Sequence, residues 1–309
     1  MEAGVARSYS VYDVFTDTRL AGNPLAVIFD GDGLTDEAMQ AIAREMNLSE
    51  TVFVQTSPNP AHSAALRIFT PARELPFAGH PTVGAAIALA ERAHAHHGGD
   101  IDLVSVLEER VGPVRCAVRL RQRQASFAEF DLPRRSQAIA LPVDKLQLAD
   151  ALGLKITEIG FENHVPSIWS AGVAFLLVPV HDVGAAERID FDPQLWEKAA
   201  PFVDGGLTSA YVYCRRTVNH TAKFHARMFS PDMGIAEDPA TGAAVAALSG
   251  AIHRFDQLPD GHHPIVVEQG FEMGRPSFIH LHIDVEAGAI SSARIGGQAV
   301  RLASGTLDL

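Results

Sequence analysis

Hydrophobic and polar residues alternate over short segments along most of the chain, which indicates strands. Turn residues separate these segments, and we expect a strand at each one. In the first half they are residues 9–15, 25–29, 51–55, 65–69, 101–107, 114–119 and 125–132, and in the second half 171–178, 209–214, 223–229, 264–268, 278–285, 289–295 and 299–304. No strand–helix–strand rhythm is sustained, so the pattern predicts an α+β protein.

Two segments, 82–92 and 240–253, are small and apolar nearly all round. A helix without a polar stripe must be enclosed on most of its sides. We therefore expect two similar domains, each with a curved sheet or barrel wrapped around one buried central helix. Other helices are predicted at 36–46, where Thr35 can cap the first turn, and at 191–200.

The two halves repeat three sequence blocks in the same order. RIFTP at 67–71 returns as RMFSP at 227–231, which is 160 positions later, and SETVF at 49–53 faces SAYVY at the same offset. PTVGAA at 81–86 faces PATGAA at 239–244, with an offset of 158. Three matches in nearly one register argue for two copies of one structural unit.

The copies differ in their polar residues. Glu50 has Ala210 opposite it, and Asp238 precedes the second proline where His80 precedes the first. A symmetric scaffold with asymmetric polar groups predicts a single site built between the two halves. Glu50 and Asp238 are therefore expected to line one cleft.

Each central helix follows a polar residue and a proline, and proline suits a first helical turn. We expect free N–H groups at the two helix starts to point outward and to bind an anion. The N–H groups in question belong to Thr82, Val83, Gly84, Thr241, Gly242 and Ala243. The alternative is that these are only well-capped structural helices.

Glu50 lies next to an apolar strand, where partial burial is expected to raise the pKa of its carboxyl group toward neutrality. Such a group can both give and take a proton. His80 and Asp238 could orient a substrate or share that proton. The simpler alternatives are a solvated glutamate at a strand edge and an aspartate that caps a helix.

The composition is that of a globular protein of 309 residues with a formal net charge of -12. This charge argues against nucleic acid or an anionic membrane as a partner. Two cysteines without CxxC spacing suggest a reduced, cytoplasmic protein, and no signal peptide or membrane-spanning run is apparent.

The sequence contains no motif for a cofactor or metal. The segment 30–33 lacks the spacing of a calcium loop, and the histidines at 94–97 and 262–263 are interpreted as surface residues. Walker A, GxGxxG, GxSxG and HExxH patterns are absent from the sequence. We therefore expect chemistry without a cofactor on a small carboxylated molecule.

Five segments together resemble the PhzF-type phenazine-biosynthesis family. They are AGNPLAVIF at 21–29, NLSETVFV at 47–54, RIFTPARELPFAGHPTVGAA at 67–86, RMFSPDMGIAEDPATGAA at 227–244 and EQGFEMGRPS at 268–277. The resemblance implies the diaminopimelate epimerase-like fold, an active site between two domains, no cofactor, and usually a homodimer. The last strand of this fold usually returns to the first domain. We therefore expect domains at 1–130, completed by about 292–309, and at 131–291.

The reference member of this family isomerises trans-2,3-dihydro-3-hydroxyanthranilate by moving a proton from C3 to C1. The resemblance implies that Glu50 shuttles the proton and that His80 and Asp238 assist it. Substrate contacts are expected at Ser49, Gly79, Thr82, Thr241, Gly242 and Ala243.

Ala243 departs from the family pattern, because the phenazine enzyme resembles TGS at this point. The backbone N–H is kept and the hydroxyl is lost, which leaves the substrate open. Epimerase relatives use a cysteine pair, but Ala78 and Pro239 lie near those places here. Cys116 and Cys214 match no such motif.

The sequence thus predicts a cofactor-independent isomerase with a Glu50 proton shuttle. An epimerase or racemase of an amino-acid-like acid, with Asp238 as a second base, remains an alternative. A catalytically silent protein that binds a ligand or a partner is another.

Overall fold

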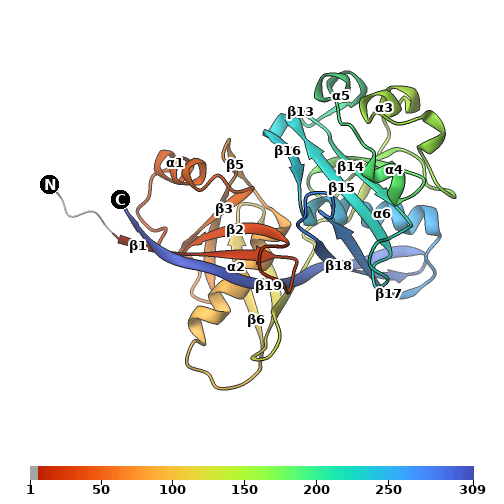
Figure 1. Cartoon of the computed structure of the whole chain (residues 1–309). Helices are drawn as coiled ribbons and strands as arrows, with labels where there is room; N and C mark the ends of the chain where they lie inside the picture. Colours follow the sequence, from red (N-terminus) through yellow and green to blue (C-terminus); the bar gives the residue numbers. More distant parts are fainter. Residues whose placement is uncertain (1–5) are drawn as a thin grey trace. The chain divides into compact units, whose positions relative to one another are not determined.

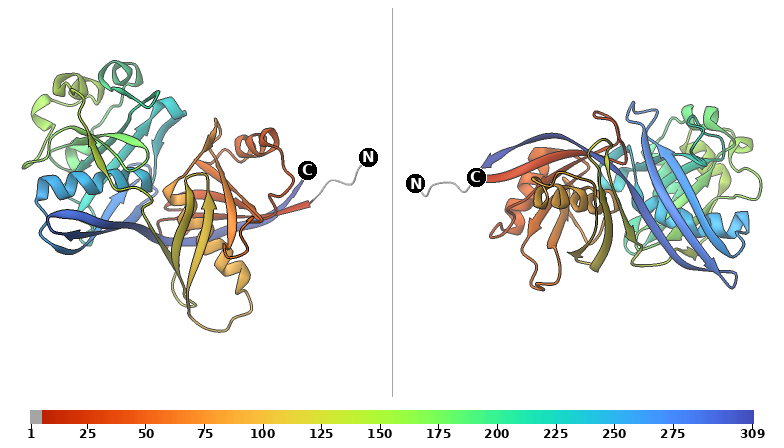
Figure 2. Two further views of the ribbon diagram at one scale, coloured as in Figure 1. Left: turned by 180° about the vertical axis from the view of Figure 1, so that it is seen from behind. Right: turned by 90° about the horizontal axis from the view of Figure 1, so that it is seen from below.

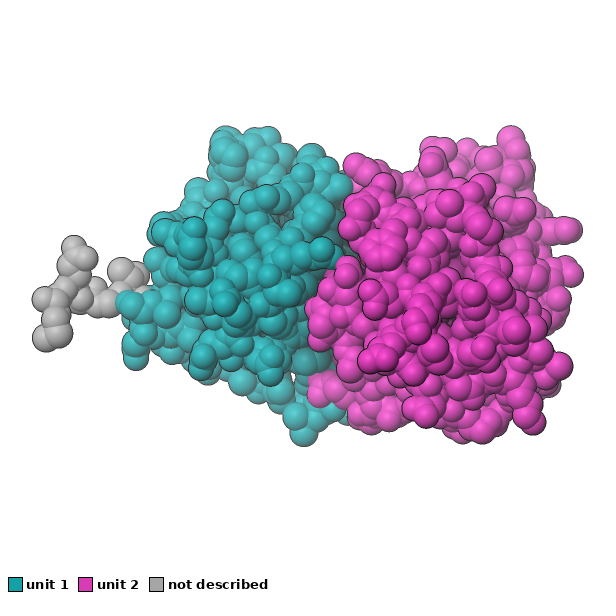
Figure 3. All heavy atoms as spheres, turned by 90° about the horizontal axis from the view of Figure 1, so that it is seen from above, with its two compact units in different colours: residues 1–131, 296–309 teal, residues 132–295 magenta. Residues whose placement is uncertain are grey.

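The structure is a computed structural model that describes residues 6–309. The described chain forms two compact units, which are coloured separately in Figure 3. Unit 1 comprises the chain up to Asp131 together with Gly296–Leu309, and unit 2 comprises Leu132–Ile295. Each unit is described by itself.

Unit 1 is built from strands that close into a ring (Figure 1). β1 pairs with β2 and β19, β2 with β3, β3 with β4, β4 with β6, β6 with β7, β7 with β8, and β8 with β19. The elements are β1 (Ala6–Val14), β2 (Asn23–Ile28), α1 (Asp36–Met46), β3 (Glu50–Gln55), β4 (Ala64–Phe69), β5 (Glu74–Leu75), α2 (Gly79–Ala93), β6 (Ile101–Glu109), β7 (Gly112–Leu120) and β8 (Ser126–Asp131).

The predicted buried helix of unit 1 is α2. It contacts β1, β2, β3, β6, β7 and β8, and most of its residues are buried. Gly84 shows why small residues are needed, because an added Cβ would lie 2.5 Å from Leu25 and 2.8 Å from Val14. The small, apolar sequence of α2 therefore lets the surrounding strands approach the helix backbone closely.

Unit 2 repeats this plan. Its strands pair in the order β9, β10, β11, β14, β15, β17 and β18, with β11 parallel to β14 and β15 parallel to β17. In unit 1, β2 is likewise parallel to β3, and β4 to β6. The elements are β9 (Gln137–Ile139), α3 (Lys145–Ala151), η1 (Ile156–Glu158), β10 (Ser167–Ser170), β11 (Ala174–Pro179), α4 (Val183–Glu187), α5 (Pro193–Ala199), β12 (Phe202–Val203), β13 (Gly206–Leu207), β14 (Ser209–Cys214), β15 (Phe224–Ser230), η2 (Pro231–Met233), β16 (Ile235–Asp238), α6 (Gly242–Asp256), β17 (Gly261–Gln269), β18 (Ser277–Glu286) and β19 (Ala289–Asp308).

The central helix of unit 2 is α6, which contacts β9, β10, β11 and β18. Figure 2 shows it beside the blue strands of the β17–β18 hairpin. Its residues from Ala244 to Ile252 are buried, as the prediction of an enclosed helix requires. The short helices α3, α4 and α5 pack over the outer face of the sheet in a core centred on Trp196.

The C-terminal segment differs from the sequence expectation. Two strands were expected there, at 289–295 and 299–304, but β19 is one continuous strand. Gly296 and Gly297 look like a break in the sequence. Glycine is required at both positions by close packing, because a Cβ atom added at Gly296 would lie 2.7 Å from Glu129 and one added at Gly297 would lie 2.3 Å from Phe15. The glycines mark close packing within unit 1, with no interruption of the strand.

Local signals correctly predicted α1. Thr35 adopts an extended conformation and its hydroxyl accepts from the Ala38 N–H at 3.2 Å. The buried face of α1 includes Met39, Ile42 and Ala43, which pack on the β-ring. The helix therefore ends up where its cap and its apolar positions predict.

No helix formed by residues 6–309 is both long enough and apolar enough to cross a bilayer.

Candidate active site

Glu50 is the first residue of β3, where it pairs in parallel register with Leu25 of β2. Its side chain is only 12% exposed, and its Oε2 lies 3.3 Å from Nδ1 of His80. The predicted acid therefore lies at the start of β3, in contact with the predicted histidine. The sequence placed 29 residues between these two positions, and the start of α2 brings them together.

His80 lies in the first turn of α2 and is 4% exposed. Burial lowers the pKa of its imidazole to about 3, although a backbone hydrogen bond to Pro24 opposes the shift. The ring is therefore neutral near pH 7 and carries one proton. Nδ1 also lies 3.4 Å from Nδ2 of Asn23, so the protonation of Nδ1 decides which neighbour it bonds.

Asn23 was missed as a site residue. No role was expected for Asn23, which is fully buried at the start of β2. The sequence carries no signal for it, because the burial of this amide depends on neighbours that are distant in the sequence.

The start of α2 corrects the expected anion site. The helix begins at Gly79, and the Thr82 N–H already donates to the Ala78 carbonyl at 3.2 Å. By helix geometry, the N–H groups without an intrahelical partner belong to Gly79 and His80. The expectation of free N–H groups at Thr82, Val83 and Gly84 is therefore wrong, because Pro81 lies inside the first turn.

Asp238 is the last residue of β16 and is 5% exposed. Its Oδ2 accepts a hydrogen bond of 2.5 Å from the hydroxyl of Thr241, the N-cap residue of α6. Asp238 thus ends a strand and fixes the residue that begins the central helix. It also lies near Tyr211, since burial and the charge of Asp238 both raise the pKa of that phenol.

The start of α6 differs from that of α2. Pro239 was expected in the first turn, but the helix begins at Gly242. The Thr241 carbonyl accepts from the N–H groups of Ala244 and Val245, both at 3.1 Å. Gly242 and Ala243 then carry the first-turn N–H groups without an intrahelical partner.

Gln269, at the end of β17, is a second residue that the sequence did not indicate. It is fully buried. Its Oε1 accepts from the Thr241 N–H at 3.2 Å, while Nε2 donates to the Asp238 carbonyl at 2.7 Å and to the Thr241 hydroxyl at 3.0 Å. The expectation of a free Thr241 N–H is therefore wrong, and Gln269 locks the helix start.

The expected site residues thus fall into two groups. Unit 1 holds Ser49, Glu50, Gly79, His80 and Thr82 around the start of α2, and unit 2 holds Asp238, Thr241, Gly242 and Ala243 around the start of α6.

The two cysteines are placed unlike reactive thiols. Cys116 and Cys214 are both buried. Burial raises the pKa of the Cys116 thiol and raises the pKa of Cys214 to about 12. Neither forms a thiolate easily near neutral pH.

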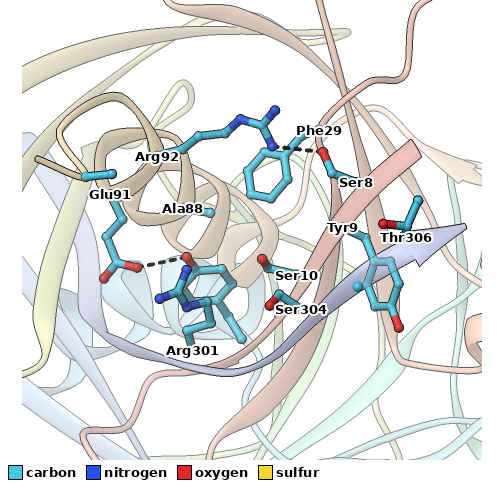
Figure 4. Close-up of a pocket in the computed structure, with 13 residues that line it drawn as sticks. Ser8, Tyr9, Ser10, Phe29, Ala88, Glu91, Arg92, Arg301, Ser304 and Thr306 are labelled. Carbon is cyan, nitrogen blue, oxygen red and sulfur yellow. Dashed lines mark hydrogen bonds between the residues drawn. The ribbon is translucent and has the colours of Figure 1, made fainter. Parts of the chain in front are cut away.

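A hollow of about 450 Å³ lies at the opposite, C-terminal end of α2 (Figure 4). Glu91 lines it and accepts a hydrogen bond of 2.8 Å from the Tyr12 hydroxyl. Arg92 donates to the Ser8 hydroxyl at 2.9 Å and covers the Phe29 ring. Glu91 and Arg92 are thus engaged by neighbouring side chains, and the residues that line the hollow do not include Glu50 or His80.

Among residues 6–309, no group of three or more His, Cys, Asp or Glu side chains is arranged to hold a metal ion.

Comparisons with known proteins give the family. The profile of the phenazine biosynthesis-like protein family matches residues 12–305. An uncharacterized isomerase of Mesorhizobium japonicum is 54% identical over 302 residues, which cover 97% of this chain and 98% of the relative. The trans-2,3-dihydro-3-hydroxyanthranilate isomerase of Pseudomonas fluorescens is 33% identical, with 98% of this chain and 99% of the relative covered.

A solved structure agrees with this assignment. The phenazine biosynthesis protein of the PhzF family from Bacillus anthracis superposes with a TM-score of 0.86 at 25% identity, and the match covers 99% of this chain and all of that one. The repeated sheet-and-helix plan and the sequence blocks at both helix starts are therefore those of an isomerase, and the chain belongs to the PhzC/PhzF phenazine biosynthesis-like family.

Proposed function

We propose that the protein is a cofactor-independent isomerase of a small carboxylated substrate and that Glu50 shuttles the proton. The reaction is similar to that of trans-2,3-dihydro-3-hydroxyanthranilate isomerase, in which a proton leaves one carbon and returns to another. The observation that carries the proposal is the contact of 3.3 Å between Glu50 Oε2 and His80 Nδ1 beside the start of α2.

The chemistry of this pair suits a single shuttle. Glu50 as a carboxylate can take a proton from a carbon next to a conjugated system, and the resulting acid can return it to a different carbon of the same substrate. The neutral His80 ring lies 3.3 Å from Glu50 and can keep the acid oriented through the transfer. Atoms and charge balance, because the proton that leaves the substrate comes back to it.

The helix starts suit a carboxylate. The N–H groups of Gly79 and His80 in unit 1, and those of Gly242 and Ala243 in unit 2, offer donors without a Lys or Arg. A helix start of this kind typically contributes about 0.3–1 kcal/mol toward a charge, and about 2 kcal/mol when partly buried. This answers how an acidic protein, with a net charge of -12, binds an anion.

We propose further that both groups act on one substrate molecule, with Glu50 moving the proton and Asp238 holding Thr241 and the start of α6 in place. The observation that supports this is the symmetry of the two units, each of which has polar groups at the start of its central helix. The site would then combine a proton-transfer half with a binding half.

A cysteine-based racemase fits the chain less well. Burial raises the pKa of both thiols, and neither lies among the residues around the two helix starts. A racemase would need Asp238 as its second base, and Asp238 already accepts from Thr241.

The test uses trans-2,3-dihydro-3-hydroxyanthranilate with the wild-type protein in D₂O, followed by NMR. The expected result is isomerisation with the moved hydrogen at its new carbon, and unchanged turnover after EDTA treatment. Inversion of a stereocentre without a shift of the double bond would favour the epimerase alternative. Activity that EDTA abolishes and a divalent ion restores would contradict the cofactor-free chemistry.

Shared action of the two halves has its own test, which is the binding of anthranilate measured by calorimetry. Both His80→Asn in unit 1 and Thr241→Val in unit 2 are expected to weaken it. A variant that binds as the wild type does would exclude its half from the site.

A further inference from the structure

Glu109, the last residue of β6, is a buried acid that the proposed shuttle does not use. Along β6, Ser105, Leu107 and Glu109 face inward, while Glu108 faces outward. Strand alternation therefore sends the Glu109 carboxyl into the ring toward α2, where it is 7% exposed. A carboxylate there is costly unless it is paired.

The contact between Glu109 and Thr82 at the start of α2 indicates that the Glu109 carboxyl group is protonated. Oε1 of Glu109 lies 2.7 Å from the Thr82 hydroxyl oxygen, and the same hydroxyl lies 2.8 Å from the Ala78 carbonyl. Thr82 has one hydroxyl proton, and a carbonyl can only accept. Both contacts are hydrogen bonds only if Glu109 is protonated and donates to Thr82, which in turn donates to Ala78.

The described residues around Glu109 supply no charge that would stabilise its ionised form. Among residues 6–309, its second oxygen, Oε2, is buried without a hydrogen-bond partner. Burial raises the pKa of Glu109 to about 8, and the Thr82 contact offsets only part of that shift.

The titratable groups on the elements packed against β6 are engaged elsewhere or neutral. On β4, Arg67 bonds Glu74 and Asp36. On β7, Arg115 pairs with Asp131, Arg119 pairs with Glu129, and Cys116 is a buried thiol. On α2, His80 faces Glu50, Glu91 bonds Tyr12, and Arg92 bonds Ser8, while on β6 itself Glu108 bonds Ser57.

We propose that Glu109 is a positioning residue for the site in unit 1, a neutral carboxylic acid that donates to Thr82 and thereby holds the first turn of α2 ready for an anionic ligand. When Glu109 ionises, it accepts the Thr82 proton instead, and the Ala78 carbonyl loses this bond. A negative charge then lies beside the N–H groups of Gly79 and His80. This reverses the attraction that the helix start offers to a carboxylate.

The first test needs no ligand and therefore does not depend on the proposed function. Glu109→Gln resembles the protonated acid, since its amide can donate to Thr82. In the unfolded chain the carboxyl ionises near pH 4.5, and in the fold near pH 8. The unfolded state thus binds fewer protons between these values, so the wild type loses stability as the pH rises through this window.

Between about pH 5 and pH 8, the melting temperature of the wild type is expected to fall by about 5–10 °C relative to that of Glu109→Gln. Above about pH 8, the difference between the two melting temperatures should stay constant. Glu108→Gln, which changes the neighbouring outward residue, is the matched control and should follow the wild type. A gap between wild type and Glu109→Gln that does not change with pH would overturn the proposal.

Infrared spectroscopy of the wild type covers the case in which Glu109→Gln does not fold. A protonated carboxyl band should persist at pH 7 and vanish by about pH 9, as expected for a pKa near 8. Its absence at pH 7 would mean that Glu109 is ionised in the fold and that the donor chain is wrong.

The second test rests on the proposed function. Raising the pH from 7 to 9 is expected to weaken anthranilate binding, and to raise KM for the carboxylate substrate, about tenfold in the wild type, as for one charge acting across a helical turn. Glu109→Gln should lack this change, while kcat stays similar in both. If Glu109→Gln removes the pH dependence of the melting temperature but keeps the pH dependence of anthranilate binding, the link between Glu109 and ligand binding is wrong. Failure of any carboxylate to bind would instead count against the proposed function.

Discussion

The starts of α2 and α6 are built on the same plan but hold different chemistry. At α2, the histidine lies inside the first turn, and a glutamate from β3 and an asparagine from β2 contact its ring. At α6, the aspartate precedes the helix and contacts Thr241, and Gln269 accepts a hydrogen bond from the Thr241 N–H. The side chains of the first start can exchange a proton, whereas those of the second are committed to holding the backbone.

The difference shows how a duplicated unit can give an asymmetric enzyme. The position of Glu50 is Ala210 in the second copy, a fully buried alanine that is the second residue of the equivalent strand β14. In unit 2, Asp238, Thr241 and Gln269 instead form hydrogen bonds with one another inside the protein. Under the proposed function, the proton is moved in unit 1 and the start of α6 in unit 2 contributes to binding. The following variants are designed to break this comparison.

The largest effect is expected for Glu50→Gln. Glutamine keeps the volume and the contact with His80, but it cannot take and return a proton near neutral pH. Turnover should fall by about 10²–10⁴-fold, as for loss of a general acid–base. The measurement is isomerisation in D₂O, with exposed Glu45→Gln on α1 as the control. Isomerisation at the wild-type rate in Glu50→Gln would move the proton shuttle to another residue.

Gln269→Leu is the corresponding test of the second helix start. The change removes three buried hydrogen bonds and leaves the Thr241 N–H and the Asp238 carbonyl without Gln269. We expect the free energy of unfolding to fall by about 2–4 kcal/mol, measured in urea. Gln147→Leu, the same change at an exposed position of α3, should stay within about 0.5 kcal/mol. Equal stabilities for the two variants would show that the Gln269 bonds do not hold the helix start.

A pH dependence is expected from His80. Its pKa is lowered from 6.5 to about 3 in the fold, so the unfolded state binds the extra proton as the pH falls below 6.5. The wild type should therefore lose about 1.4 kcal/mol per pH unit from this group between pH 6.5 and 5.

His80→Asn removes the titrating group, so the stability of the variant should fall less steeply over the same range. Exposed His96→Gln is the control and should keep the wild-type slope. Identical slopes in His80→Asn and the wild type would show that the imidazole is not held neutral by burial.

The smallest effect is expected for Ala243→Ser, which restores the hydroxyl that the resembling phenazine enzyme carries. One added hydrogen bond contributes about 0.5–1.5 kcal/mol, so kcat/KM for dihydrohydroxyanthranilate should rise by up to about tenfold. Ala243→Gly keeps the N–H and adds no hydroxyl, and it should change little. A fall in kcat/KM for the serine variant would indicate that the natural substrate fills this space with an apolar group.

Much of the architecture follows from local sequence. Strand alternation and the Thr35 cap predicted β14 and α1 at their observed bounds, and the absence of a polar stripe predicted the enclosure of α2 and α6. These features depend on side-chain periodicity and on hydrogen bonds between near neighbours. The sequence repeat likewise indicated Glu50, His80 and Asp238, because it showed where the two copies differ.

Only the tertiary structure decided the exact helix starts and the partners of the buried polar groups. Pro81 lies within α2 while Pro239 precedes α6, although both sequences read alike, because Gln269 and Asp238 hold the second start in a different conformation. Gly296 and Gly297 read as a break, and close packing against Glu129 and Phe15 keeps them in β19. Asn23, Glu109 and Gln269 gave no signal, since the cost of burying a polar group depends on neighbours that are distant in the sequence.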